Sequence, residues 1–148
     1  MDETEYRSAY QDINPTRCVY EKSINSRVCN CSCAKRFNLA DREGVSCNSP
    51  QAQKICVELI GVLREKARFV LQQTSIDGPL PHNADIKIQN GGVKGLVKLM
   101  DNPACNEQDI HRVIRSALEK YQSLDQLPYS DIMQEIAAYQ GRRRSRKK

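Results

Sequence analysis

Apolar residues recur at three- and four-residue spacing between Ser49 and Gln73, and this stretch is the clearest helix in the sequence. Ser49 is typical of an N-cap residue, and Pro50 is typical of the first helical position. The apolar positions are Ala52, Cys56, Leu59, Ile60, Leu63, Ala67, Val70 and Leu71. Charged residues occupy the opposite side, so the pattern predicts an amphipathic helix with one buried face.

Three further helices are expected in the C-terminal part of the chain. The first is a two-turn helix over residues 93–100, and the second runs from near Asn106 to about Ser123. After Pro128 breaks the chain, Ser130 is expected to cap a last helix that ends near Gly141. About four helices result, and the fold class is mainly α.

Residues 74–92 carry the signals of a loop, because proline and glycine interrupt them repeatedly. Within them, residues 86–88 alternate briefly and are expected to form an extended segment or a short strand. Residues 89–95 contain several glycines but match neither common glycine-rich phosphate-binding motif. We therefore interpret residues 89–95 as the turn that enters the next helix.

The length of 148 residues predicts one folded domain with two appendages. Residues 1–16 form an acidic leader with one or two helical turns, ended by Asn14-Pro15. Residues 17–141 form a single small helical domain, and within it residues 17–56 are an irregular, cysteine-rich, metal-binding segment. Aromatic residues are scarce, with six Tyr, two Phe and no Trp, so the core is expected to consist mainly of aliphatic side chains.

The positive charge of the chain is concentrated in its last seven residues. Six of them are cationic, and removing these six from the net charge of +5 leaves −1. We expect residues 142–148 to be disordered. Their charge is suited to non-specific contact with nucleic acid, to an acidic lipid surface or to an acidic protein, and a solubilising tail without a partner is the alternative. The tail contains no aromatic residue on which a base could stack. Its candidate partner-binding residues are Arg142, Arg143, Arg144, Arg146, Lys147 and Lys148.

No apolar run reaches the roughly 20 residues that a membrane-spanning helix requires. The acidic N-terminus does not resemble a secretory signal. Both observations favour a cytoplasmic protein, in which thiols stay reduced. Clustered cysteines in that setting indicate metal or redox chemistry rather than disulfides.

Six of the seven cysteines fall between residues 18 and 56. The neighbours of Cys29, Cys31 and Cys33 are polar, so these three do not fit an apolar core face and are better explained as metal ligands. The expected ligands are Cys18, Cys29, Cys31, Cys33 and Cys47. Cys56 is a further candidate for cofactor binding, although it also lies on the apolar stripe of its helix. Cys105 is expected to pack in the core.

The spacing of the three central cysteines favours a wide metal centre. Alternate residues of an extended segment lie about 6.6 Å apart on one side. One zinc ion instead draws each sulfur to about 2.3 Å from the metal, so its sulfurs lie much closer together than alternate residues do. Cys47 lies two residues before the Ser49 N-cap, where free amides stabilise a thiolate. The pattern therefore predicts an iron–sulfur cluster of unassigned type, with zinc as the alternative.

The sequence contains no acid–base pair and no nucleophile constellation, so an enzyme is the less favoured interpretation. His82 and His111 are interpreted as isolated surface residues. The expected function is electron transfer, or an accessory role beside an oxidoreductase or a cluster-dependent assembly, with a protein partner. The alternative is a zinc-stabilised interaction module whose basic tail binds nucleic acid or an acidic partner. A metal-free thiol redox sensor is a third hypothesis.

Overall fold

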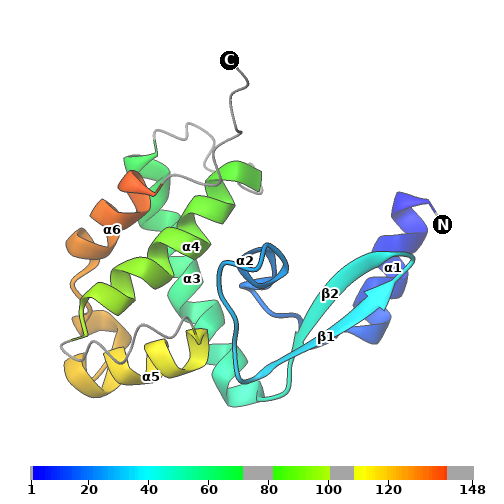
Figure 1. Cartoon of the computed structure of the whole chain (residues 1–148), viewed down its shortest axis with the longest axis horizontal. Helices are drawn as coiled ribbons and strands as arrows, with labels where there is room; N and C mark the ends of the chain where they lie inside the picture. Colours follow the sequence, from blue (N-terminus) through cyan, green and yellow to red (C-terminus); the bar gives the residue numbers. More distant parts are fainter. Residues whose placement is uncertain (1, 72–81, 101–108, 140–148) are drawn as a thin grey trace.

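The computed structural model describes residues 2–71, 82–100 and 109–139, which form a helical body with a two-stranded hairpin at one end (Figure 1). The described helices are α1 (Glu3–Ile13), α2 (Glu21–Asn25), α3 (Pro50–Val70), α4 (His82–Lys98), α5 (Ile110–Tyr121) and α6 (Tyr129–Ala138). The strands are β1 (Ala34–Leu39) and β2 (Arg42–Cys47). Among the described helices, none combines the length and the apolar character needed to cross a membrane. The mainly α fold class is confirmed, with two more helices than expected.

The acidic leader forms a longer helix than the sequence predicted. α1 has eleven residues, about three turns, and ends at Asn14 as expected. Tyr10 explains the extra length, because its side chain is buried against Phe37 with the ring centroids 5.6 Å apart. Asn14 Nδ2 also donates to the backbone oxygen of Val45 at 3.0 Å. Tertiary contacts with the hairpin therefore hold a helix whose own sequence is mostly polar.

The cysteine-rich segment is not irregular, because it contains the hairpin. β1 and β2 pair antiparallel in a register that runs from Ala34 opposite Cys47 to Leu39 opposite Arg42. Ala40 and Asp41 form the two-residue turn, and both have positive φ angles, 50° and 67°. Such turns usually carry Asn-Gly or Asp-Gly. The absence of that signal explains why the sequence did not predict the hairpin.

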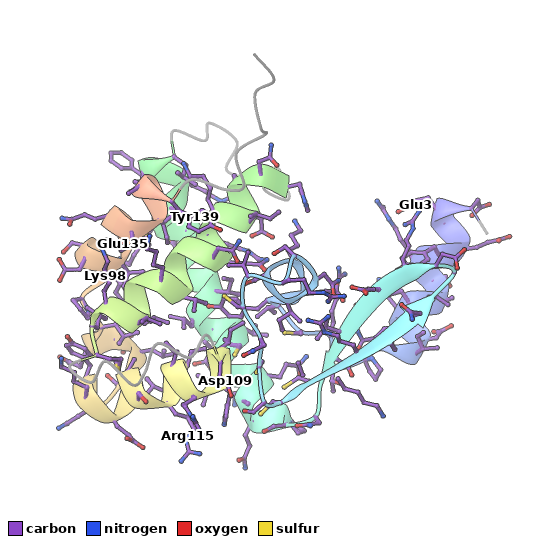
Figure 2. All side chains as sticks on the ribbon, in the orientation of Figure 1. Glu3, Lys98, Asp109, Arg115, Glu135 and Tyr139 are labelled. Atoms are coloured by element: carbon purple, nitrogen blue, oxygen red, sulfur yellow. The ribbon has the colours of Figure 1, made fainter. Side chains whose placement is uncertain are left out.

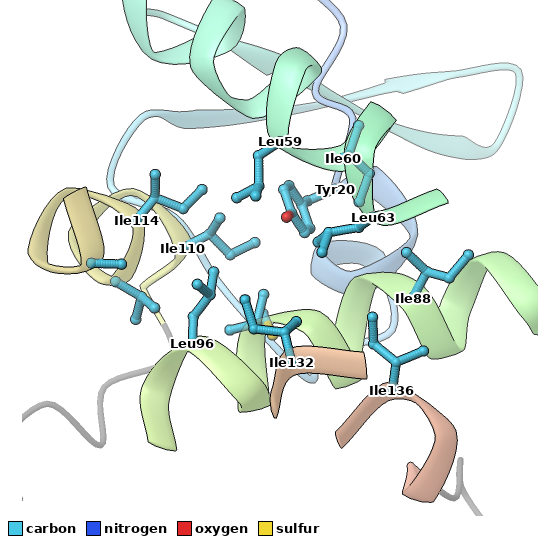
Figure 3. Close-up of a cluster of buried hydrophobic side chains, with 14 of the residues drawn as sticks. Tyr20, Leu59, Ile60, Leu63, Ile88, Leu96, Ile110, Ile114, Ile132 and Ile136 are labelled. Atoms are coloured by element: carbon cyan, nitrogen blue, oxygen red, sulfur yellow. The ribbon is translucent and has the colours of Figure 1, made fainter. Parts of the chain in front are cut away.

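The predicted helix after Ser49 is confirmed at its start. The Ser49 hydroxyl accepts a hydrogen bond from Ala52 N at 3.2 Å, and Pro50 occupies the first helical position. The apolar stripe of α3 faces the centre of the helical body, where its largest side chains are almost fully buried (Figure 3). They meet residues of α4, α5 and α6 in one core, which includes Leu59, Leu63, Ile88, Leu96, Ile110, Ile132 and Ile136.

The predicted loop between residues 74 and 92 is wrong from His82 onward, because α4 begins there and continues to Lys98. Ile86 to Ile88 is helical, and so is the stretch that was interpreted as an entry turn. Gly91 lies where α4 and α6 pack closely: a Cβ atom there would lie 2.7 Å from Ile136 Cα. The glycines that lower helix propensity locally are thus required for helix packing, and the packing outweighs the propensity.

α5 and α6 follow the predicted pattern with shifted ends. α5 begins at Ile110 and is capped by Asp109, whereas the predicted start near Asn106 lies outside the described residues. α6 begins at Tyr129 with Pro128 at the N-cap position, so the predicted Ser130 cap is wrong. Residues 72–81 and the predicted disordered tail, residues 142–148, also lie outside the described part.

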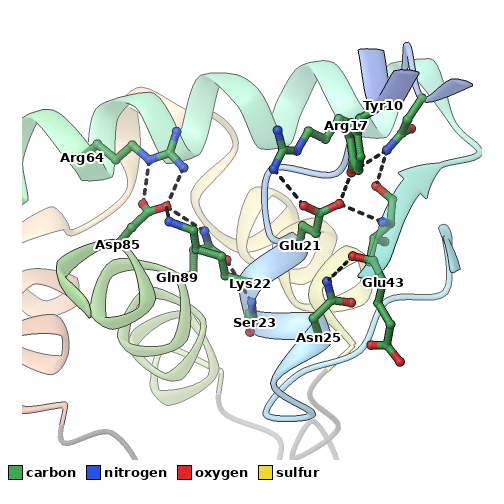
Figure 4. A network of polar contacts seen from close by, with 12 residues as sticks. Tyr10, Arg17, Glu21, Lys22, Ser23, Asn25, Glu43, Arg64, Asp85 and Gln89 are labelled. Carbon is green, nitrogen blue, oxygen red and sulfur yellow. Dashed lines mark hydrogen bonds and ion pairs between the residues drawn. The ribbon is translucent and has the colours of Figure 1, made fainter. Parts of the chain in front are cut away.

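A buried carboxylate joins three helices. Asp85 on α4 accepts two hydrogen bonds from the Arg64 guanidinium of α3, at 2.9 and 3.2 Å (Figure 4). Lys22 of α2 lies 3.1 Å from the same carboxylate, and Gln89 donates to it at 3.1 Å. The Gln89 side-chain oxygen in turn accepts from Ser23 N at 3.0 Å. This network fixes α2, which precedes the cysteine loop, against the helical body.

Replacement of Asp85 by Asn is expected to lower the free energy of unfolding at pH 7 by about 1.5 kcal/mol, because Arg64 and Lys22 lose their counter-charge while remaining partly hydrated. Burial alone would raise the pKa of Asp85, but hydrogen bonds and charge from Arg64 and Lys22 outweigh it and lower the pKa below 3.8. The ion pairs therefore stabilise the fold above about pH 4 and lose this effect as the pH falls through the folded-state pKa. Urea denaturation at several pH values should show the difference between wild type and Asp85→Asn shrinking below pH 4. A difference that stays constant down to pH 3 would contradict this role.

Candidate metal centre

Five cysteines that are distant in sequence line one cavity, which we call the thiol cavity. It lies where the open end of the hairpin meets the first turns of α3 and α5, and sulfur atoms gather there in Figure 2. Its cysteines are Cys18, Cys31, Cys33, Cys47 and Cys56. They come from four segments: the connection before α2, the loop before β1, the end of β2, and α3.

Backbone pairing places Cys18 beside Cys47. The Cys18 amide donates to the oxygen of Val45 at 3.0 Å, and the Cys47 amide donates to the oxygen of Thr16 at 2.8 Å. Residues 16–18 therefore run antiparallel along β2, with Arg17 bridging to Ser46. This pairing links residues almost thirty positions apart, and no local pattern in the sequence indicates it.

The loop that carries Cys31 is tied to the start of α5. Ile110 N donates to the oxygen of Asn30 at 2.9 Å, and Ser32 N donates to the side chain of Asp109 at 3.0 Å. The chain then turns, with Ala34 N donating to the oxygen of Cys31 at 3.1 Å. Cys31 and Cys33 thus reach one cavity through a turn and not through an extended strand.

Cys47 lies beside the N-terminus of α3, as the sequence indicated. Its Sγ donates to the backbone oxygen of Ser49 at 3.2 Å. Ala52 and Cys56, from the first two turns of α3, line the same cavity. Ile110 and His111, the first two residues of α5, do so as well. Two helix N-termini therefore face the thiol cavity, and their amides favour negative charge there.

Cys29 does not join the other cysteines. Its side chain is 5% exposed and belongs to the hydrophobic core. The turn after α2 directs it there, since the amides of Val28 and Cys29 both donate to the oxygen of Ser23, at 3.3 and 3.4 Å. The extended alternation that grouped Cys29 with Cys31 and Cys33 is absent from the structure. Cys105 lies outside the described residues.

The walls of the thiol cavity are mostly apolar. Val19, Tyr20, Ala34, Ala52 and Ile110 supply them. Tyr20 is fully buried, and its hydroxyl has no hydrogen-bond partner among the described residues. An orphaned buried donor costs about 1–3 kcal/mol. The five thiols in an otherwise mostly apolar lining fit a sulfur-ligated group.

Burial and mutual repulsion keep the isolated thiols neutral. Burial raises the pKa of Cys18 to about 12, and repulsion from Cys31 and Cys47 adds to the effect. Burial also raises the pKa of Cys56 to about 12, with repulsion from Cys18, Cys31, Cys47 and Cys33. Reactive redox-sensing thiols have a lowered pKa, whereas burial raises the pKa of Cys18 and Cys56. A bound metal cation would displace the thiol protons, and its positive charge would stabilise thiolates that otherwise repel one another.

Backbone amides are already directed at two of the sulfurs. A hydrogen bond from the Tyr20 amide lowers the pKa of Cys18 against the larger effect of burial. Hydrogen bonds from the amides of Cys33 and His111 do the same for Cys31. Such bonds stabilise the thiolate form that a metal requires. Hydrogen bonds of this kind are typical around metal-bound sulfur.

His111 is the member of this site that the sequence interpretation missed. It is half-buried at the second position of α5 and lines the thiol cavity with the five cysteines. Its position two residues after Asp109, in the first turn of α5, was the available signal, because anions often bind at helix N-termini. His82 is exposed at the first residue of α4, away from the thiol cavity.

The side chains at the thiol cavity are of the kinds that bind zinc or iron, namely cysteine and histidine. Within residues 2–71, 82–100 and 109–139, no three His, Cys, Asp or Glu side chains converge closely enough to hold one metal ion. The thiols line a cavity of about 20 Å³, which is room for about one water molecule, so a bound cluster would require the thiols to move apart. Comparison with known proteins gave no match to a family model, a curated protein or a solved structure, so the residues of the thiol cavity carry the functional argument.

Proposed function

We propose that this chain is a small iron–sulfur protein that serves in electron transfer or as an accessory component of an oxidoreductase. The observation that carries the proposal is the convergence of five thiols, from four segments, on one cavity with apolar walls. Four thiolates suffice for the common iron–sulfur clusters. Chance packing of small hydrophobic side chains would not be expected to gather five of the seven cysteines of a 148-residue chain at one cavity.

We assign the ligand role to Cys18, Cys31, Cys47 and Cys56. All four line the thiol cavity, and burial together with charge on Cys18, Cys31 or Cys47 raises the pKa of Cys56. Cys33 lines the same cavity, and its charge has the smallest effect of the four cysteines on the pKa of Cys56. We therefore treat Cys33 as the additional thiol.

A cluster and a single zinc ion differ in the spacing of their ligands. Zinc draws four ligands to about 2.0–2.3 Å from one centre, whereas a polynuclear cluster accepts a wider frame. Among the described residues, no group of three His, Cys, Asp or Glu side chains forms a ready site for a metal ion. The half-buried His111 is the observation that favours zinc, since mixed Cys and His sets are common in structural zinc sites.

The protein's own residues would control the chemistry of the site. The apolar side chains of Val19, Ala34 and Ile110 limit the access of water. The amides of Cys33 and His111 would donate to sulfur, which stabilises added negative charge. A bound cluster supplies reversible one-electron transfer. The first turns of α3 and α5 would add the positive ends of their helix dipoles.

Reconstitution under nitrogen with ferrous iron and sulfide tests the proposal. We expect broad visible absorbance that bleaches on reduction by dithionite and returns on oxidation, together with a paramagnetic signal in one of the two states. The same protein incubated with zinc alone is the control. Failure to acquire iron and sulfide, combined with tight uptake of one zinc, would refute the iron–sulfur assignment.

A further inference from the structure

Two further hollows are lined by the loop after α2, by α4 and by Tyr139. They share Val28, Asn90 and Tyr139 and form one groove between the loop after α2 and the exposed side of α4. We call it the amide groove, because Asn25 and Asn90 both line it. None of its described lining residues is an acid.

The amides of the amide groove are held in place but incompletely paired. Asn90 is 3% exposed, and its Nδ2 donates to the Tyr139 hydroxyl at 3.2 Å, yet its Oδ1 has no partner in the described structure. Asn25 Nδ2 donates to the oxygen of Glu43 at 3.2 Å, and its Oδ1 is likewise unpartnered. Buried polar atoms without partners are rare in folded proteins. Two of the five such atoms among the described residues belong to side chains of this groove, and a ligand with hydrogen-bond donors would satisfy them.

Cationic and aromatic groups complete the amide groove. Lys94 lies one turn after Asn90 on α4, is exposed, and makes no ion pair with the described residues. Lys98 follows one turn later and pairs with Glu135 at 2.9 Å. Tyr139 lies at the end of α6. Figure 2 labels Tyr139, Lys98 and Glu135. In the sequence, Tyr139 directly precedes the segment that contains the six positive charges of residues 142–148.

We propose that the amide groove binds single-stranded nucleic acid. An asparagine amide matches the paired donor and acceptor on a base edge, and adenine is its best partner. Tyr139 would supply a stacking surface, and Lys94 a contact to phosphate. This proposal does not depend on the metal proposed for the thiol cavity.

Fluorescence anisotropy with a labelled single-stranded adenine-rich 12-mer, titrated with the full chain at several salt concentrations, tests the proposal. We expect Tyr139→Ala to weaken binding by about tenfold and Tyr139→Phe to weaken it much less, because phenylalanine retains the ring. Lys94→Ser should weaken binding severalfold and reduce the dependence on salt by about one phosphate contact. Lys54→Ser is the matched control, since this exposed lysine lies on α3 outside the groove and should leave the affinity unchanged.

Deletion of residues 142–148 separates the amide groove from the tail. We expect the shortened chain to bind more weakly and still to lose affinity on Tyr139→Ala. The proposal is overturned if the 12-mer does not bind, if Tyr139→Ala and Lys94→Ser match wild type in chains with the same melting temperature, or if the tail deletion abolishes all binding. An equal preference for double-stranded DNA would also contradict it, because a duplex does not expose its bases for stacking.

Discussion

Replacement of Cys18 or Cys56 by alanine is expected to abolish the retention of iron. Each thiolate contributes one of the four proposed bonds, and each faces the other proposed ligands across the thiol cavity. Removing a ligand should weaken the centre by more than the roughly 100-fold loss that follows removal of an outer-shell partner. Iron and acid-labile sulfide, measured per chain after reconstitution and desalting, give the result directly.

Two other cysteines provide matched controls. Cys29→Ala removes a thiol that is buried in the core outside the thiol cavity, and it should retain iron at the wild-type level. Cys33→Ala removes the additional thiol and should also retain it. Loss of iron in Cys29→Ala with an unchanged melting temperature, or retention in both Cys18→Ala and Cys56→Ala, would show that the ligand assignment is wrong.

Gly91→Ala is expected to lower the free energy of unfolding by about 2 kcal/mol, in spite of alanine's higher helix propensity. The new Cβ would lie 2.7 Å from Ile136 Cα and 3.1 Å from the backbone oxygen of Glu135. These are backbone atoms, so relief requires α6 to move away from α4. Overpacking of this kind costs about 1–3 kcal/mol. Urea denaturation at pH 7, with a constant slope against urea, measures the change.

Gly61→Ala is the control for this prediction, because it is also a glycine within a helix but a Cβ there meets nothing within 4 Å. It should raise the free energy of unfolding by about 0.5–1 kcal/mol. Both substitutions replace a glycine by alanine within a helix. If Gly91→Ala lowers the free energy of unfolding while Gly61→Ala raises it, the cost arises from the contact between α4 and α6. A stabilising effect of Gly91→Ala would mean that the two helices do not pack this closely.

The sequence predicted those helices and helix ends that depend on local signals. The apolar stripe after Ser49, the Asn14-Pro15 stop and the pattern around Ile110 all correspond to observed helices or helix ends. The pattern failed where tertiary contact outweighs propensity. The start of α4 looked like a loop because Gly91 and its neighbours are poor helix formers, although close packing against α6 requires small residues there.

The candidate site could be predicted in composition but not in arrangement. Clustering identified the cysteine segment, and the Ser49 cap placed Cys47 at a helix end. The position of Cys29 could not be derived, because the turn after α2 breaks the assumed alternation. The participation of His111 depends on the contact between Asn30 and Ile110, which joins segments eighty residues apart.

The metal content of protein purified without oxygen tests the central claim most directly. Iron, zinc and acid-labile sulfide are measured per chain, for wild type and for Cys56→Ala. The iron–sulfur proposal predicts iron and sulfide in equal amounts in wild type, and neither in the variant. One zinc per chain without sulfide, or a metal content that Cys56→Ala does not change, would contradict it.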